Sequence, residues 1–334
     1  MRAFAVFVAA AATALATPAL ANDTMAELKT GGLVFVRSDV VQIESEDLYI
    51  SPDAVRVAYS FRNGSDEDVS SIVAFPMPEI TADPYSNIAL PEPGRDNFLS
   101  FTVTVEGRAI EPELEQRALA AGLDITDELS AAGIPVNHLA EGVREALTQL
   151  PADTLADWTA RGIVTPDSYD DGSGWKTEYA PRWTLKSTYW WRMDFPAGRS
   201  IAVRHDYKPS VGGTTGLNFF YDGKPGGPYY ENYKRKYCID ASLERALIKA
   251  AAQNENGYPP YWENWISYVL KTGANWASTI GRFHLTIDKG DTANLVSFCG
   301  DGVKKTGPTT FEMSYQDFYP ENDIEILLLR KFEN

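Results

Sequence analysis

The sequence predicts a mainly β protein with some helix (α+β): an antiparallel β-sandwich, an inserted helical segment and a smaller C-terminal α+β region. Short runs of alternating apolar and polar residues, separated by turn signals, recur through residues 33–105. An Ala-, Leu- and Glu-rich segment with helical spacing follows at residues 111–163. Both cysteines lie in the last third of the chain, which indicates a separately stabilised C-terminal part.

The longest alternating stretch runs from residue 182 to residue 211 and predicts two strands joined by a turn at residues 196–198. Alternation of this length is typical of a half-buried antiparallel ribbon. His205 falls on its apolar face, which favours a hydrogen-bonded core histidine over a ligand or a base. The predicted core faces comprise Trp183, Leu185, Tyr189, Trp191, Met193 and Phe195 on the first strand, and Ile201, Val203, His205 and Tyr207 on the second.

Earlier strands are expected at residues 30–36, 40–50, 54–62, 69–75 and 98–105. Asn63-Gly64 predicts a hairpin, because both residues tolerate positive φ. The expected organisation is a first part of the sandwich (22–110), the helical insertion (111–163), a β-ribbon that completes the sandwich (164–211) and the C-terminal region (212–334).

The insertion should contain three or four short helices that act as a lid or packing cap, with ligand gating as the alternative. A polar loop is expected at residues 166–174. In the C-terminal region, Asp240 or Ser242 should cap a helix that ends near Gln253. The remaining alternating runs predict a second, smaller sheet, with strands at residues 265–270, 283–287, 295–299, 310–315 and 324–329.

Residues 1–21 have the features of a secretory signal peptide, with Arg2 before a short apolar run and a small-x-small cleavage site between Ala21 and Asn22. A membrane anchor is the alternative, but the run is shorter than the roughly 20 residues that span a bilayer. No later stretch predicts an integral span. We expect a soluble protein that is periplasmic or secreted.

The net charge of −16 repels phosphate backbones and anionic lipids, so a nucleic-acid partner is not expected. In an oxidising compartment, an even and minimal cysteine count predicts one disulfide, between Cys238 and Cys299. A reactive cysteine pair is the alternative, but no CxxC spacing supports it.

The sequence assigns no catalytic residue, no metal site and no cofactor. The three histidines (His138, His205, His284) lack HxH or HExxH spacing, and hydrolase and P-loop motifs are missing. The acidic group Glu44, Glu46 and Asp47 is compatible with calcium but lacks the loop pattern, so a solvated edge is expected. This absence of signal does not exclude an enzyme.

Aromatic residues are the one enriched feature, and most are expected to pack in the core. Trp190 is predicted on the polar face of its strand near Arg192, and a second group follows at residues 229–237. An exposed aromatic flanked by hydrogen-bonding groups is a typical binding surface. The candidate binding residues are Trp190, Arg192, Tyr229, Tyr230 and Tyr233.

Several segments resemble one family of exported bacterial proteins, the family of domain of unknown function 4424. They are AELKTGGLVFVRSDVVQIESEDLYISPDAVRVAYSFRN, VAFPMPEI, VRHDYKPSVGG, YVLKTGANW and FHLTIDKGDTANLVSFCGDGVKKTGPTTFE. The family has no established activity, so the resemblance implies no catalytic residue. The order FRN, FPMP and EGRAI is also similar to the vault/inter-alpha-trypsin type β-sandwich, which implies that residues 183–210 pair with strands of residues 33–105.

Three hypotheses about function follow. The first is a non-catalytic binding protein for a cell-envelope ligand or protein partner. The alternatives are a hydrolase acting on envelope glycans or peptides, and a structural envelope protein. Buried, convergent acids in a cleft would favour the hydrolase, whereas an exposed aromatic platform would favour binding.

Overall fold

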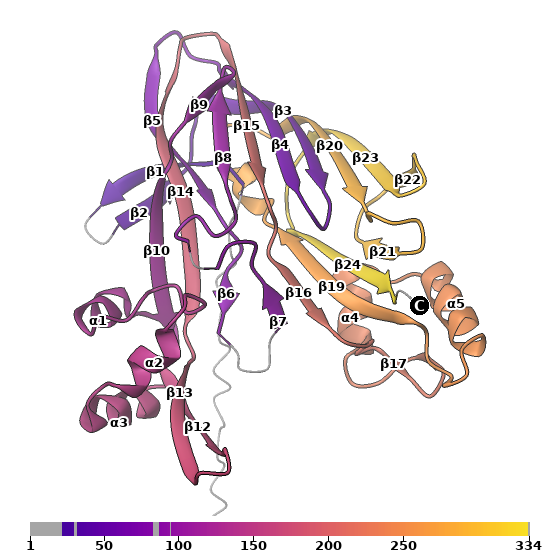
Figure 1. The fold of residues 1–334 in the computed structure, drawn as a ribbon. Coiled ribbons are helices and arrows are strands. Elements are labelled where there is room, and N and C mark those ends of the chain that lie inside the picture. The colour runs from indigo at the N-terminus through magenta and orange to yellow at the C-terminus, as the bar shows by residue number, and fades with distance from the viewer. Residues whose placement is uncertain (1–21, 30–31, 83–86, 94, 333–334) are drawn as a thin grey trace, which may run out of the picture.

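The computed structural model describes residues 22–29, 32–82, 87–93 and 95–332, so the predicted signal peptide lies outside the described residues. The protein is mainly β, with antiparallel sheets and a few helices, as predicted. Three large sheets, here called A, B and C, form the framework (Figure 1).

Sheet B has more strands than sheet A or sheet C. Its eight strands have the spatial order β22 (Lys304–Lys305), β23 (Thr310–Phe318), β20 (Ile280–Asp288), β3 (Val41–Ile50), β4 (Val55–Asn63), β15 (Ser200–Tyr207), β8 (Thr102–Val105) and β9 (Arg108–Ile110). The pairing of β3 with β20 is parallel, and the other pairings in sheet B are antiparallel.

Sheets A and C both pack on sheet B. Sheet A has the order β11 (Leu123–Asp124), β10 (Glu113–Ala120), β14 (Thr184–Phe195), β5 (Val69–Pro76), β1 (Thr24–Lys29) and β2 (Gly32–Val36), with β6 (Ile80–Thr81) also beside β14. Sheet C has the order β21 (Leu295–Phe298), β24 (Ile324–Lys331), β19 (Tyr261–Tyr268), β16 (Val211–Thr214) and β7 (Asn87–Ala89).

Helices cover the far ends of sheets A and C (Figure 1). Beside sheet A lie α1 (Thr126–Ala131), α2 (Val143–Thr148), α3 (Ala152–Ala160) and the hairpin of β12 (Val164–Asp170) and β13 (Trp175–Pro181). Beside sheet C lie α4 (Tyr230–Tyr237), α5 (Ala241–Ala252) and the short pair β17 (Phe220–Tyr221) and β18 (Lys224–Pro225). A 3-10 turn, η1 (Lys271–Asn275), follows β19.

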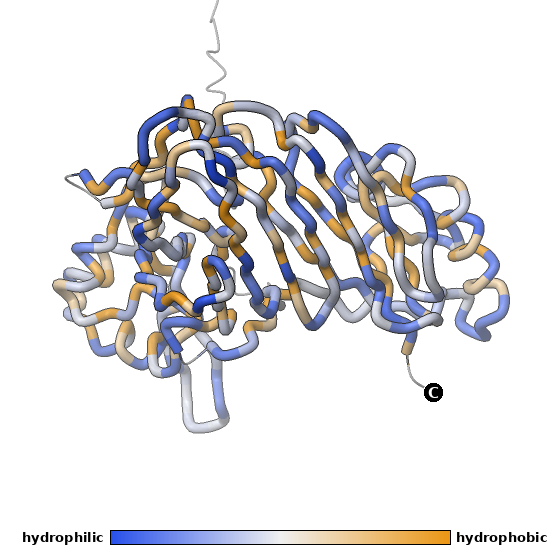
Figure 2. Tube along the Cα trace, turned by 90° about the horizontal axis from the view of Figure 1, so that it is seen from above, coloured by the Kyte–Doolittle hydropathy of each residue, from blue (hydrophilic) through white to orange (hydrophobic). Residues whose placement is uncertain are grey.

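One core joins the three sheets. Inward-facing residues of sheet A such as Phe75, of sheet B such as Phe61 and of sheet C such as Ile266 belong to a single buried cluster. The two core faces predicted for residues 183–195 and 201–207 are buried as expected. Figure 2 shows hydrophobic and hydrophilic positions alternating along extended segments of the chain, which is the pattern that directs one face inward.

The predicted ribbon is wrong in its pairing. β14 and β15 lie in different sheets: β14 pairs with β5 and β10, whereas β15 pairs with β4 and β8. The predicted Asn63-Gly64 hairpin is wrong for the same reason, since β4 belongs to sheet B and β5 to sheet A. Alternation specifies which face is buried but not which strand lies alongside, and here each connection crosses the sandwich. The expected pairing of residues 183–210 with earlier strands is correct.

Two local predictions in the middle of the chain are also wrong. Residues 113–120, expected to be helical, form β10, because Leu114 and Ala118 share a face in a strand as well as in a helix. Residues 166–170, expected in a loop, belong to β12. The other helices of the segment do form, and their apolar residues pack with Ala118 and Trp183.

The predicted second sheet of the C-terminal region is divided. β20 and β23 extend sheet B, whereas β19, β21 and β24 form sheet C. The predicted helix is confirmed as α5, and the Asp240 carboxylate caps it by accepting from the backbone N–H groups of Ser242 and Leu243. The tyrosine-rich segment forms α4.

Candidate functional site

A cluster of polar side chains lies inside the core where the three sheets meet. We call it the polar junction, and it comprises Asn22, Asp23, Glu46, Tyr59, His205, Tyr268 and Thr272. Glu46, Tyr59 and His205 come from sheet B, Tyr268 ends β19 of sheet C, and Asn22 and Asp23 precede β1 of sheet A. Most polar groups of the junction bond to one another, and His205 Nδ1 is one that has no partner among the described residues.

Glu46 reaches the junction because β3 is irregular. The register between β3 and β4 shifts between Ile43 and Ser45. This bulge changes which residues face inward, so that Val41 and Ile43 are buried before it and Glu46 and Leu48 after it. The solvated edge predicted for the acidic group is therefore wrong for Glu46, although Asp47 is exposed.

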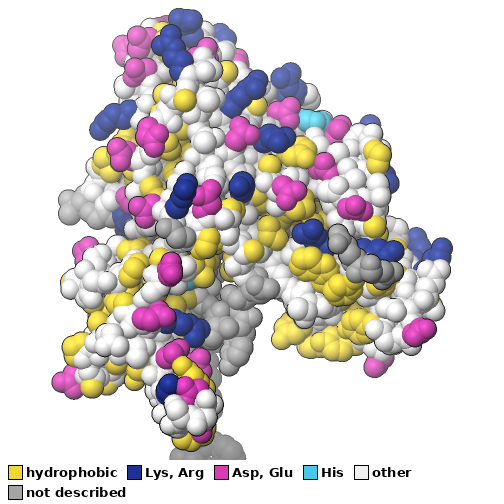
Figure 3. All heavy atoms as spheres, viewed as in Figure 1, with side chains coloured by type: hydrophobic (Ala, Val, Ile, Leu, Met, Phe, Trp, Pro, Cys, Tyr) yellow, Lys and Arg dark blue, Asp and Glu magenta, His cyan; other side chains and the backbone are white. Residues whose placement is uncertain are grey.

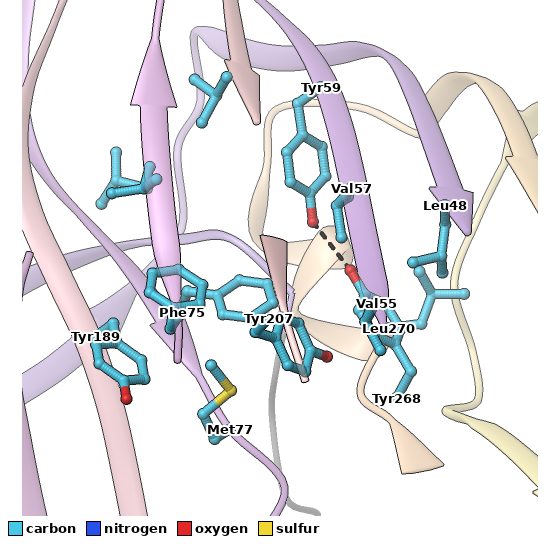
Figure 4. Packing of buried hydrophobic residues seen from close by; sticks show 14 of the residues in the cluster. Leu48, Val55, Val57, Tyr59, Phe75, Met77, Tyr189, Tyr207, Tyr268 and Leu270 are labelled. Carbon is cyan, nitrogen blue, oxygen red and sulfur yellow. Dashed lines mark hydrogen bonds between the residues drawn. The ribbon is translucent and has the colours of Figure 1, made fainter. Parts of the chain in front are cut away.

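Hydrogen bonds link the residues of the junction. The hydroxyl groups of Tyr59 and Tyr268 lie 3.1 Å apart and point toward one another (Figure 4). The Tyr268 hydroxyl also donates to Glu46 Oε1 at 3.3 Å. His205 Nε2 lies 3.0 Å from Asp23 Oδ2, which confirms the prediction that His205 is a hydrogen-bonded core histidine.

Burial controls the protonation of the two acids. It raises the pKa of Glu46 to about 8, assisted by the neighbouring Asp23 carboxylate and opposed by hydrogen bonds from Asn22 and Tyr268. Burial also raises the pKa of Asp23, although His205 acts in the opposite direction. Asp23, Glu46 and His205 are between 0% and 1% exposed, so the junction holds these groups away from solvent.

A groove of about 1050 Å³ lies on the surface beside the disulfide. It is lined by β21, by the start of α5, by β23 and by the segment from Tyr319 to Ile324. Its half-buried apolar wall includes Val296, Phe298 and Phe318, which pack against the main core. Tyr319 is 57% exposed at the border of the groove.

The edge of a sheet borders this groove. β21 is the last strand of sheet C in the described residues, and all four of its residues line the groove. Asp301 and Glu321 are exposed acids of the lining. In contrast, Lys289 is turned inward, where its ammonium group donates to the carbonyl oxygens of Thr292 (2.7 Å) and Asn294. The groove thus combines an apolar wall, an edge strand and exposed acidic groups, with Lys305 as an exposed cation in the lining.

The five predicted binding residues lie on two separate surfaces. Trp190 and Arg192 are on β14 of sheet A, whereas Tyr229, Tyr230 and Tyr233 are at α4, which packs on sheet C (Figure 1). Figure 3 shows hydrophobic side chains gathered near sheet C on the face that it displays.

The tyrosines of α4 have different environments. Tyr229 is 55% exposed. Tyr230 donates to the Glu244 carboxylate and accepts from Lys234 at 3.1 Å. Tyr233 is buried and donates to Glu263 Oε2 at 2.8 Å, and burial raises the pKa of Glu263 to about 7. Only Tyr229 of the three offers most of its ring to a partner.

Trp190 is half-buried on the outer face of sheet A. Ala26, Ile72 and Ala74 form a small cluster there, and Trp190 packs against it together with Leu33 and Phe35 of β2. Arg192 on the same strand is exposed.

We expect Trp190→Ala to lower the free energy of unfolding by about 2 kcal/mol, because truncation of a fully buried Trp costs about 3–5 kcal/mol and Trp190 is only half-buried. Urea denaturation of the purified protein measures the change, with Arg192→Ala as the matched control on the same face. An unchanged urea midpoint would mean that the Trp190 indole does not stabilise the fold and is available only for binding a partner.

The predicted disulfide is confirmed: Cys238 and Cys299 are bonded and connect the end of α4 to the residue after β21. The described residues hold no group of three or more His, Cys, Asp or Glu side chains placed to bind a metal ion. His138 Nε2 bonds to the Ile80 carbonyl oxygen at 2.9 Å, and His284 Nδ1 bonds to the Ser314 hydroxyl at 2.8 Å.

These features define a class of protein: a three-sheet β framework with a sealed polar junction, one disulfide and a groove at a sheet edge. The sequence profile of the family DUF4424, described as a domain of unknown function, matches residues 21–327. The chain belongs to this family, as the resemblance implied. Comparison with curated protein sequences finds no match.

Two solved structures illustrate how distant the structural likenesses are. A candidate nutrient-binding protein of Legionella pneumophila subsp. pneumophila str. Philadelphia 1 is 17% identical, over 93% of this chain and 70% of that one, with a TM-score of 0.45. The M1 zinc metallopeptidase of Deinococcus radiodurans is 10% identical, over 87% of this chain and 43% of that one, with a TM-score of 0.24. This chain thus spans less than half of the metallopeptidase, and neither likeness bears on function.

Proposed function

We propose that this chain is an exported, non-catalytic binding protein that is cut between Ala21 and Asn22 and acts in the periplasm or outside the cell. The signal-like sequence of residues 1–21 supports export. The Cys238–Cys299 disulfide supports an oxidising compartment. Among the described residues, every helix is too short or too polar to cross a membrane.

The groove beside the disulfide is the proposed binding site, and its position at the edge of sheet C is the observation that carries this proposal. An edge strand presents backbone donors and acceptors that an extended peptide can pair with. A volume of about 1050 Å³ is at the upper limit of ordinary ligand sites. We therefore propose that the ligand is an extended segment of an envelope protein.

The exposed acids of the groove favour basic residues in that segment. Its wall is apolar at Val296 and Phe298, while Asp301 and Glu321 are exposed acids in the lining. The whole chain carries a net charge of −16, which favours the approach of cations. A peptide in which apolar and basic residues alternate matches this surface, because alternate side chains of a strand point to opposite faces.

The hydrolase alternative would need buried, convergent acids in an open cleft, whereas the groove acids Asp301 and Glu321 are exposed. The acids of the junction, Asp23 and Glu46, instead lie beneath the sheets with almost no exposed surface. The surfaces at Trp190 and Tyr229 are alternatives to the groove as the ligand-binding site. Substitutions of these two residues and of groove residues show which of the three surfaces binds the ligand.

Fluorescence anisotropy tests the groove with a labelled 12-residue peptide of alternating Val and Lys, and with a Val/Glu peptide as its control. We expect the basic peptide to bind and the acidic peptide not to bind. Glu321→Lys and Tyr319→Ala should each raise Kd at least tenfold, about 1.4 kcal/mol. Tyr229→Ala is the matched control, because this exposed tyrosine does not line the groove.

The proposal fails if the basic peptide does not bind, or if the groove variants bind it as well as the original protein. If Trp190→Ala or Tyr229→Ala abolishes peptide binding and the groove variants do not, the binding site lies on the surface of the substituted residue. Export is tested separately by the intact mass of the protein from the envelope fraction, which should correspond to a chain that begins at Asn22.

A further inference from the structure

Asn22 occupies an unusual position for a residue expected to begin a mature chain. It is 0% exposed, and every polar group it has is hydrogen-bonded. Its backbone nitrogen donates to Thr272 Oγ1, and the Thr272 hydroxyl donates to its carbonyl oxygen at 2.6 Å. Its side chain accepts from the Tyr59 hydroxyl and donates to Glu46 Oε2 at 3.2 Å.

The space around Asn22 fits this residue closely. A Cβ atom added to Gly273 would lie 2.8 Å from Asn22 Nδ2, which is closer than real contacts allow. The next residue, Asp23, is also buried and faces His205, and the indole N–H of Trp276 donates to the Asp23 carbonyl oxygen at 2.7 Å. Residues 22 and 23 are thus held by sheet B, by the η1 segment and by the residues next to η1.

When both acids of the polar junction are ionised, their charges do not balance within the side chains alone. Two carboxyl groups, Asp23 and Glu46, meet one imidazole, His205. Tyr59 and Tyr268 are the other titratable groups that face Glu46, and burial raises the pKa of both, so they remain neutral. A buried carboxylate without a cationic partner is unfavourable.

We propose that the α-ammonium group created by cleavage before Asn22 remains inside the polar junction and supplies this missing positive charge, so that removal of the signal peptide completes the fold. The proposal rests on the proposed export and cleavage. The reaction is hydrolysis: water adds across the bond between Ala21 and Asn22, the carbonyl carbon becomes a carboxylate, and the nitrogen leaves as an ammonium group. The net change is one new negative charge on the released segment and one new positive charge in the junction.

The test compares two purified chains, one beginning at Asn22 and one that retains Ala21 before it. In the chain that retains Ala21, the nitrogen of Asn22 is an uncharged amide. In that chain, burial raises the pKa of Glu46 from 4.5 to about 8. The contribution of the Glu46 carboxyl group to the free energy of unfolding is therefore complete below pH 4.5 and is lost as the pH rises through 8. In the processed chain, the ammonium group favours the ionised carboxylate instead.

Glu46→Gln should therefore have opposite effects on the melting temperature of the two chains at pH 8. We expect a rise of roughly 5 °C in the chain that retains Ala21, because an unfavourable ionisation is removed. We expect a fall of similar size in the chain that begins at Asn22, because the substitution removes the negative charge that the Asn22 side chain contacts and that offsets the ammonium group. Glu44→Gln is the matched control on the same strand, and its effect should be the same in both chains.

Labelling of the terminal amine by 2-pyridinecarboxaldehyde gives a second readout that needs no variant. The amine of the chain beginning at Asn22 should react only after unfolding in urea, whereas the amine of Ala21 should react in the folded protein. Rapid labelling of Asn22 in the folded protein, or a Glu46→Gln effect of the same sign in both chains, would overturn the proposal. If the exported protein begins at a residue other than Asn22, the proposed cleavage site is wrong. That outcome is distinct from one in which the chain begins at Asn22 but its ammonium group is not buried.

Discussion

Reduction of the Cys238–Cys299 disulfide is expected to lower the free energy of unfolding by about 4 kcal/mol. The two cysteines are 61 residues apart in sequence, and the bond restricts a loop of that length in the unfolded chain. The loop contains α5, β19, η1, β20 and β21, so it includes strands of both sheet B and sheet C. Urea denaturation with and without dithiothreitol measures the difference.

The double variant Cys238→Ser/Cys299→Ser should reproduce this loss without any reductant. Because Cys238 and Cys299 both line the groove, the reduced protein should also bind the Val/Lys peptide more weakly. An unchanged urea midpoint, with a mass increase confirming that the bond was reduced, would show that packing alone holds α4 and β21 together.

His205→Leu is expected to cost about 3–5 kcal/mol at pH 7, because it leaves the buried Asp23 carboxylate without its partner. Burial already raises the pKa of Asp23, and His205 opposes that rise. Without His205 the pKa of Asp23 rises further above its ordinary value of 3.8, so the folded state retains a proton that the unfolded state releases. The loss of stability should therefore be small near pH 4 and grow toward pH 8.

Denaturation curves at several pH values check this dependence. His205 is also in contact with the rings of Tyr59, Phe75, Phe101 and Trp191, so the substitution changes packing as well as charge. The double variant Asp23→Leu/His205→Leu separates the two causes, because it removes the acid and should abolish the dependence on pH. A loss that is constant between pH 4 and pH 8 would assign the effect to packing.

The fold was predictable as far as local patterns determine it. Alternation along residues 183–195 and 201–207 located two strands and their buried faces correctly. It did not reveal that each strand pairs within a different sheet, because pairing depends on contacts distant in sequence. β10 was missed because Leu114 and Ala118 have a spacing that fits either a strand or a helix.

The candidate sites were less predictable than the fold. The disulfide followed from the cysteine count, and the core position of His205 followed from the strand period. Glu46 could not be located, because one extra residue in β3 reverses the face to which the following side chains point, and the bulge has no distinctive sequence. The groove joins β21, α5 and β23, which no local pattern connects.

The parallel pairing of β3 with β20 has a consequence for the order in which the chain assembles. It joins residues 45–50 to residues 282–287, across more than two thirds of the sequence. If the amino end crosses a membrane first, β3 waits with one side unpaired until β20 has also crossed. An exposed strand edge is prone to pair with other chains. Slow translocation should therefore prolong the period in which this edge of the unfinished protein is open to pairing with other chains.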